Sequence, residues 1–461
     1  MTPMLAVVPG LFAPFQSLLS FLPQIAIALV AAATALFRPQ VYRWAWTTAK
    51  SHRAVSATLA VLILGGAAGG VAWSRAHRPW LPPPPEEAKR DGWWCFRLNS
   101  ERTGSDGSAV GGSVRAIWKF RDTIDRAAFS SSPAFWAGRI YVGCDNDAVY
   151  CFDAATGRDP LWTFPTRYPV FAPPVVANGR MYTGEGLHHN TDARLYCADA
   201  VTGKKLWQFQ TTSHVEYSGT VAEGRIYFGA GDDGVYCLDA ETGAKIWQAK
   251  GRHVDQSPLV VRGLVIVGVG YGETGVMALR ASDGQVVWST KLPSSAWGEP
   301  ALGPRGVIVG IGNANFEKQD PDPKAELLCL SLDGGGVVWR TPLTDSPLGP
   351  AAVSGDRAFL GDFSGDFSCF DVNTGRKIWT AGCGRPVLTG AAIAKDAVVF
   401  SCNGGHVHAV RPENGGEIWR YDATKDVFSG TDCRFFSSPA VVGGRVYVGC
   451  NNFYFYCLGE K

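Results

Sequence analysis

One stretch of sequence decides the fold: Cys237-Leu238-Asp239-Ala240-Glu241-Thr242-Gly243-Ala244-Lys245-Ile246-Trp247. It predicts a hairpin, because an apolar strand ends at an Asp whose side chain caps a turn, a Gly supplies a positive φ angle, and a second strand follows. Residues 197–207 and 369–379 have the same form. A local pattern that returns in this way indicates a repeat architecture.

A Trp marks each repeat, at intervals of 40 to 51 residues. The marked positions are Trp118, Trp162, Trp207, Trp247, Trp288, Trp339, Trp379 and Trp419. Two more short apolar segments precede each hairpin, as at 132–135 and 139–143, so every unit has four strands. Four-stranded units of about 40 residues with Gly-rich turns are typical of propeller blades, and helical solenoids need apolar residues at a spacing of 3.6 instead.

The two ends of the array predict how the ring closes. Residues 113–120 contain a fourth strand with its Trp118 but lack three strands before it, and residues 434–458 contain three strands with no Trp after them. Joined, the fragments complete one blade, which removes two exposed sheet edges. The sequence therefore predicts an all-β, eight-bladed β-propeller over residues 96–461, whose last blade is built from both ends.

The repeated phrase, Ala/Cys-x-Asp-x-x-Thr-Gly-x-x-x-Trp, resembles the tryptophan-docking repeat of pyrroloquinoline-quinone (PQQ) propellers. The phrases at Asp199, Asp239 and Asp371 fit it well; the phrase at Asp153 has one extra residue, and Arg280, Ser331 and Arg411 replace the Asp elsewhere. The resemblance implies the propeller fold. It leaves the function open, since the repeat serves quinoprotein dehydrogenases, the propeller lipoprotein of the outer-membrane β-barrel assembly machinery and many anchored proteins.

The N-terminal part predicts a membrane anchor over residues 1–80. The uncharged runs 15–37 and 54–73 are long enough to cross a bilayer at about 1.5 Å per residue. A basic loop, 38–53, separates them and favours two helices with both chain ends outside the cytoplasm, in the periplasm or outside the cell. A single span, or a signal peptide followed by one span, is the alternative. A Pro-rich linker at 81–95 follows.

The cysteines are expected to be core thiols. Six of the twelve occupy one position in the third strand of their units, where Ala278 and Ala409 stand in two others. A site that accepts Cys or Ala favours a small buried side chain. The pairing of Cys95, Cys383 and Cys433 stays open. No Cys-x-x-Cys occurs, which disfavours a structural zinc site.

Acidic side chains gather where innermost strands are expected to line a central channel. Two units contain His214-Val215-Glu216 and His253-Val254-Asp255, and the next places Glu299 two residues beyond the equivalent position. Two residues is one pleat, so the three carboxylates point to the same side. They predict a site for a hard cation such as calcium, assisted by Asn313. In quinoprotein dehydrogenases a Glu and an Asn bind calcium beside PQQ, so Glu216, Asp255, Glu299 and Asn313 are candidate cofactor ligands. The alternative is a solvated polar rim.

Histidine pairs at 188–189, beside Glu185, and at 406 and 408 offer transition-metal ligands, although pairs on loops are often incidental. The formal net charge of +2, with 18% charged residues, gives no field for nucleic acid.

The first function expected is a non-catalytic binding or scaffold module on a membrane tether, with a protein or peptide partner on a propeller face. The alternative is a PQQ-dependent oxidoreductase, against which stand the lack of an adjacent Cys-Cys pair and of a matching Asp base. Sensing of a carbohydrate or small ligand is a third class.

Overall fold

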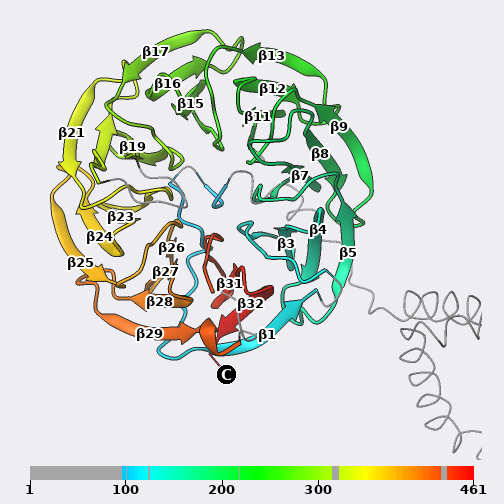
Figure 1. Ribbon diagram of the computed structural model, residues 1–461, viewed down its shortest axis with the longest axis vertical. Coiled ribbons are helices and arrows are strands. Elements are labelled where there is room, and N and C mark those ends of the chain that lie inside the picture. Colours follow the sequence, from blue (N-terminus) through cyan, green and yellow to red (C-terminus); the bar gives the residue numbers. More distant parts are fainter. Residues whose placement is uncertain are drawn as a thin grey trace, which may run out of the picture. The chain divides into compact units, whose positions relative to one another are not determined.

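The computed structural model describes residues 96–99, 101–122, 125–217, 219–313, 321–426 and 433–460. These residues form eight four-stranded antiparallel sheets arranged around a common centre (Figure 1). The prediction of an eight-bladed, all-β propeller is thereby confirmed.

Strand bounds follow the four-strand pattern in each blade. The first four blades contain β2 (Ala134–Trp136), β3 (Arg139–Cys144), β4 (Ala148–Asp153) and β5 (Pro160–Pro165); β6 (Val175–Ala177), β7 (Arg180–Gly184), β8 (Arg194–Asp199) and β9 (Lys205–Gln210); β10 (Thr220–Ala222), β11 (Arg225–Gly229), β12 (Val235–Asp239) and β13 (Lys245–Ala249); and β14 (Leu259–Val261), β15 (Leu264–Val269), β16 (Gly275–Arg280) and β17 (Val286–Lys291). The next three contain β18 (Ala301–Gly303), β19 (Gly306–Ile311), β20 (Glu326–Leu330) and β21 (Val337–Pro342); β22 (Ala352–Ser354), β23 (Arg357–Gly361), β24 (Asp366–Asp371) and β25 (Lys377–Gly382); and β26 (Ala392–Ile393), β27 (Val398–Cys402), β28 (His406–Val410) and β29 (Glu417–Asp422), followed by the 3-10 turn η2 (Ala423–Asp426).

The eighth blade is the composite one. It contains β30 (Ala440–Val442), β31 (Arg445–Gly449), β32 (Tyr454–Gly459) and, as its outermost strand, β1 (Arg115–Arg121). Strand β1 pairs with β32 in antiparallel register, with Trp118 opposite Cys457 (Figure 1). The predicted closure of the ring by both ends of the array is confirmed.

The repeat Trp residues join each blade to the next. Seven of the eight indole N–H groups donate to a backbone carbonyl in the following blade's turn between the third and fourth strands, at 2.8–3.3 Å. The ring lies against that turn's Gly, since a Cβ added at Gly157, Gly203, Gly243, Gly284, Gly335, Gly375 or Gly415 would stand 2.1–2.7 Å from indole atoms. The Gly is therefore required by packing as well as by its positive φ.

Each Trp also faces a small residue inside its own blade. Cys151, Cys197, Cys237, Cys329, Cys369 and Cys457 stand opposite the Trp of the outermost strand, and Ala278 and Ala409 take their place in two blades. All six thiols are buried and free. Burial raises the pKa of these thiols, as for Cys237 to about 11, so they stay protonated and serve as packing groups.

The segment before β1 enters the centre of the ring. Backbone N–H groups of Val353, Ile393 and Val441, on strands β22, β26 and β30, donate to carbonyls at Glu101, Thr103 and Gly104. The buried Arg102 guanidinium donates to the carbonyls of Pro300, Ser257, Pro258 and Phe96 at 2.7–3.3 Å. This segment thus ties together innermost regions of blades far apart in sequence.

The predicted anchor and linker, 1–80 and 81–95, lie outside the described residues, as do Cys95 and residues 314–320 between β19 and β20. Within the part of the chain that the structure describes, there is no helix with the length and apolar character needed to cross a membrane.

Candidate functional site

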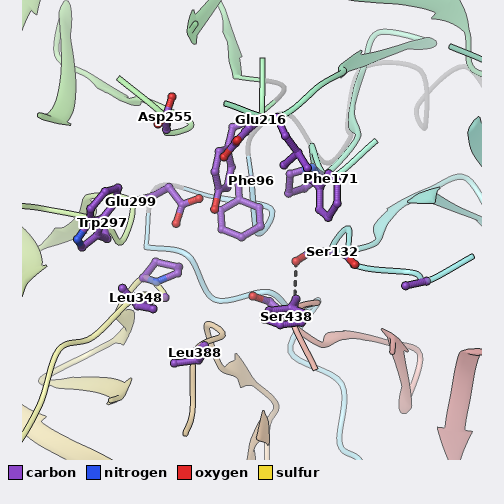
Figure 2. Close-up of a pocket in the computed structure, with 18 of the residues that line it drawn as sticks. Phe96, Ser132, Phe171, Glu216, Asp255, Trp297, Glu299, Leu348, Leu388 and Ser438 are labelled. Carbon is purple, nitrogen blue, oxygen red and sulfur yellow. Dashed lines mark hydrogen bonds between the residues drawn. The ribbon is translucent and has the colours of Figure 1, made fainter. Parts of the chain in front are cut away.

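A cavity of about 560 Å³ lies at the centre of the ring (Figure 2). In a four-stranded antiparallel blade, the turn between the second and third strands and the end of the fourth strand lie at the same edge. The cavity is lined from these two kinds of connection, with Asp145 and His188 from the first kind and Phe171, Glu216 and Leu388 from the second. We call this cavity the central cup.

The walls of the central cup combine aromatic rings with acids. Its lining includes Phe96, Phe171, Tyr217, Trp297 and Phe436, and Phe96 packs edge-on against Tyr217 with 5.9 Å between ring centroids. The charged side chains of the lining are Asp145, Glu216, Asp255 and Glu299, with Arg434 and the titratable His188. Such a surface suits a ligand with apolar and cationic parts.

Three of the four predicted site residues meet in the central cup. Glu216 and Asp255 occupy matching places in the β9–β10 and β13–β14 connections, and Glu299 follows in the β17–β18 connection (Figure 2). Asn313 is not part of this lining. Its exposed side chain donates to the Asp322 carbonyl at 3.0 Å, and its N–H donates to the Pro323 carbonyl, so it joins the two ends of the β19–β20 connection.

The carboxyl groups of Asp145, Glu216 and Glu299 share one electrostatic property. Burial raises the pKa of each to about 7. For Glu299 the guanidinium groups of Arg102 and Arg97 oppose this shift, and for Glu216 the negative charge of Asp255 adds to it. One oxygen of each of the three carboxyls is buried without a hydrogen-bond partner among the described residues, as is Trp297 Nε1. Most buried polar atoms in proteins have a hydrogen-bond partner, so these four atoms are open to contact with a ligand or with water.

Sequence reasoning missed the group that surrounds Asp255. His214 Nε2 lies 2.7 Å from Asp255 Oδ1, and His253 Nε2 lies 2.5 Å from Asp255 Oδ2. His188, from the β7–β8 connection, places Nδ1 3.7 Å from Asp255 Oδ2 and Nε2 3.6 Å from Glu216 Oε1. Sequence analysis had paired His188 with Glu185, but Glu185 is buried and accepts from the backbone N–H groups of Arg167 and Tyr168.

The charges of this group support one another. Burial alone would lower the pKa of His253, but its contacts with Asp255 and Asp232 raise that pKa to about 9. The pKa of His214 is also raised, by Asp255 against burial. Burial opposes ionisation of Asp255, yet the two imidazoles hold its pKa well below the usual range. His253 and Asp255 therefore form an ion pair at neutral pH, and His214 Nε2 lies within hydrogen-bond distance of the same carboxylate.

A second cluster lies elsewhere, where Cys383, Cys402 and His408 place their ligand atoms within 4.8 Å of one another. Cys402 Sγ is 3.8 Å from His408 Nε2, and His408 Nδ1 is 3.2 Å from Glu417. Cys433 and Cys450 also approach, with 3.4 Å between sulfur atoms. None of these residues lines the central cup.

The lining of the central cup does not fit PQQ, the cofactor that the fold suggests. That quinone is a tricarboxylate, whereas the described lining presents four carboxyl groups against one guanidinium. Burying further anions beside acids without added cations is unfavourable.

Comparison with known proteins places the chain among relatives of two kinds. A family profile described as outer membrane protein assembly factor BamB matches residues 100–187, 187–305 and 321–458. Outer membrane protein assembly factor BamB of Burkholderia pseudomallei is 27% identical over 54% of this chain and 65% of that protein. Quinohemoprotein alcohol dehydrogenase ADH-IIG of Pseudomonas putida is 31% identical over 21% of this chain and 16% of that protein. The chain thus spans less than two thirds of the length of these two relatives.

Solved structures agree on the fold. BamB from Moraxella catarrhalis superposes with a TM-score of 0.59 at 16% identity, over 76% of this chain and all of that one (100%). Quinohemoprotein alcohol dehydrogenase from Comamonas testosteroni gives 0.63 at 13% identity, over 80% of this chain and 81% of that one.

Proposed function

Because the chain belongs to the family described as outer membrane protein assembly factor BamB, we propose that it is a non-catalytic, membrane-anchored binding module outside the cytoplasm. Its partner is a protein, held on the face that carries the central cup. The relatives named as assembly factors support a role of this kind. The anchor is the pair of apolar runs 15–37 and 54–73, and the propeller is the part that binds.

The observation that carries the proposal is the lining of the central cup. Aromatic rings of Phe171, Trp297 and Phe436 stand beside four carboxyl groups, and Trp297 Nε1 and Glu299 Oε1 are buried without partners. Rings and carboxylates together recognise the guanidinium of Arg or the ammonium of Lys. A partner segment that inserts an Arg or a Lys would contact both the rings and the carboxyl groups.

The test uses the purified full chain in detergent and a phage-displayed library of random peptides. We expect enrichment of peptides that carry Arg or Lys beside aromatic residues. Trp297→Ala or Phe171→Ala should weaken a selected peptide by about 30-fold or more, the usual loss for an aromatic anchor in a desolvated pocket. Val286→Ala is the control, because Val286 is exposed on the outermost strand β17. Enrichment of acidic peptides would contradict the proposal. So would an affinity of both cup variants for the selected peptide that equals the affinity of the parent.

A second candidate, a quinone-dependent oxidoreductase, has the fold likeness to the alcohol dehydrogenases in its favour and the acidic lining against it. Addition of PQQ and calcium, followed by a redox-dye assay, separates the two: dye reduction that Trp297→Ala abolishes would favour the enzyme.

A further inference from the structure

Three histidines from three blade connections converge on Asp255, which lines the central cup together with His188. His188 comes from the β7–β8 connection, His214 from β9–β10 and His253 from β13–β14. One nitrogen of each, together with a carboxylate oxygen of Asp255, lies within 4.8 Å of the others. A tetrahedral ion with bonds of about 2.0–2.1 Å holds its ligand atoms about 3.4 Å apart. The observed spacings bracket that value, so small side-chain rotations are enough to close a coordination shell.

Local backbone geometry aims the side chains at one point. His214 and Glu216 flank the buried Val215, and His253 and Asp255 flank the buried Val254. The N–H of Val215 donates to the Glu185 carbonyl and that of Val254 to the Gly231 carbonyl, which fixes both segments. Alternation along an extended chain then places each His and its acid on the side opposite the valine. The repeated His-Val-acid sequence thus delivers two imidazoles to one space.

The outer nitrogens have the supports that metal-binding histidines require. His253 Nδ1 lies 2.7 Å from Asp232 Oδ1, and His214 Nδ1 lies 3.3 Å from Ser213 Oγ. A proton on Nδ1, donated to such an acceptor, leaves the lone pair of Nε2 free to face an ion. In both residues Nε2 is the atom directed at Asp255.

A second carboxylate, which would be a fifth donor, stands next to the group. Glu216 Oε1 is buried, has no hydrogen-bond partner among the described residues, and lies 3.6 Å from His188 Nε2. The ring of Tyr271 packs edge-on against His253, with 4.8 Å between ring centroids, and closes one side. The exposed side of the group is that of His188, whose side chain is 49% accessible, so an ion can enter there.

We propose that His188, His214, His253 and Asp255 bind one first-row transition-metal ion of the zinc class at the central cup. Imidazole nitrogens favour zinc, cobalt, nickel and copper, whereas calcium prefers oxygen ligands alone. The ion differs in class from the calcium expected from the carboxylates in the sequence. The site goes beyond partner binding, and its existence does not depend on what the central cup holds.

The competing explanation is an ion-free network in which His214 and His253 hydrogen-bond to the Asp255 carboxylate. The test begins with the purified full chain in detergent, stripped with EDTA and titrated with Zn²⁺ by calorimetry and with Co²⁺ by visible absorption. We expect one tightly bound ion and the intense visible bands of tetrahedral cobalt. Absence of a bound ion at micromolar Zn²⁺ would establish the network and overturn the proposal.

Variants locate the ion. His188→Ala and His253→Ala should each weaken Zn²⁺ binding by about 100-fold or more, and Asp232→Asn by about 10- to 100-fold, the usual range for an outer-shell partner. His189→Ala, on the neighbouring exposed residue, should leave the affinity unchanged. Cys383→Ser tests whether the thiol cluster contributes, and it should leave the cobalt bands in place. Equal Zn²⁺ affinity of His188→Ala and His189→Ala would overturn the proposal. Thermal melts without metal test whether each variant folds. If the variants of more buried residues fail to fold, the exposed His188→Ala variant still gives a result.

Discussion

The turns between third and fourth strands and the connections that line the central cup differ in how they use the repeat. The turns place the same groups in blade after blade, an Asp or its substitute, a Gly and the neighbouring Trp. The central connections differ from blade to blade, with Phe171, Glu216, Asp255, Glu299 and Leu388 at related places. The repeated groups hold blades together, and the departures from the repeat build the site.

One exception within the turns clarifies their role. Trp419 Nε1 is buried and has no hydrogen-bond partner among the described residues. The next blade is the composite one, in which the turn between third and fourth strands is replaced by the separate strands β32 and β1. The carbonyl that receives the indole N–H in the other blades is therefore missing at this junction.

Among the changes considered, loss of the closing strand β32 should reduce stability most. Deleting residues 454–461 removes β32, leaves β1 without its partner and exposes apolar faces of both flanking blades. We expect the melting temperature to fall by more than about 10 °C, or the protein to aggregate. Deleting residues 1–8, which precede all the strands of the ring in the sequence, is the control. An unchanged melting temperature would mean that the ring does not depend on the shared blade.

A methyl group on the turn Gly that contacts the neighbouring blade's Trp should have the next largest effect on stability. A Cβ at Gly243 would lie 2.7 Å from the Trp207 ring, on a residue with φ of +74°. Gly243→Ala should therefore lower the free energy of unfolding by about 3 kcal/mol, from backbone strain and overpacking.

Gly224→Ala is the matched control for this substitution. Gly224 has φ of +72° but nothing within 4 Å of an added Cβ, so only the backbone strain of about 1 kcal/mol should remain. Urea denaturation measures both variants. Equal losses would show that the Trp does not dock on the Gly.

The groups in the turns stabilise the fold, whereas the buried acids of the central cup should reduce its stability. The pKa of Asp145 is raised to about 7 by burial, against about 3.9 in an unfolded chain. Between these values the folded state keeps a proton that the unfolded state has released, so stability falls as pH rises from about 4 to 7 and then levels off.

Asp145→Asn removes this titration. Because Asp145 is only half-buried, we expect the variant to be more stable than the parent by about 1–2 kcal/mol at pH 8, with the gap closing toward pH 4. Denaturation midpoints at several pH values measure the gap. A gap independent of pH would contradict the assigned shift.

The indole N–H should contribute a smaller amount. Trp247 donates to the Ala281 carbonyl at 3.0 Å, whereas Trp419 has no acceptor. Both substitutions to Phe lose ring volume, but only Trp247→Phe also loses a hydrogen bond. We expect it to be more destabilising than Trp419→Phe by about 1 kcal/mol in urea denaturation. The reverse order would mean that ring packing alone sets the effect.

Most of the fold follows from the sequence because its determinants are local and repeated. Asp239 accepts from the N–H groups of Glu241 and Thr242 and from the Thr242 hydroxyl, which is the turn that the eleven-residue phrase predicts. The occurrence of either Cys or Ala opposite each Trp likewise indicates a single packing position that requires a small side chain. The incomplete units at the two ends were sufficient to predict the composite blade.

The site could be predicted from the sequence only where its residues occupy equivalent positions in the repeat. Glu216 and Asp255 occupy equivalent positions, so their meeting at the central cup could be predicted. His188 lies in a different kind of connection, and no spacing in the sequence relates it to His214. The repeated His-Val-acid motif was a usable signal for His214 and His253, but only its carboxylates were interpreted as metal ligands. Asn313 does not join the lining, because its side chain and its N–H donate to the carbonyls of Asp322 and Pro323.

The central claim, that departures from the repeat build a site at the centre of the ring, is tested most directly by anomalous diffraction at the zinc absorption edge. Crystals of the full chain, grown with Zn²⁺, should show one strong peak about 2.0–2.1 Å from Nε2 of both His214 and His253. Density without such a peak, with both nitrogens still hydrogen-bonded to Asp255, would contradict it.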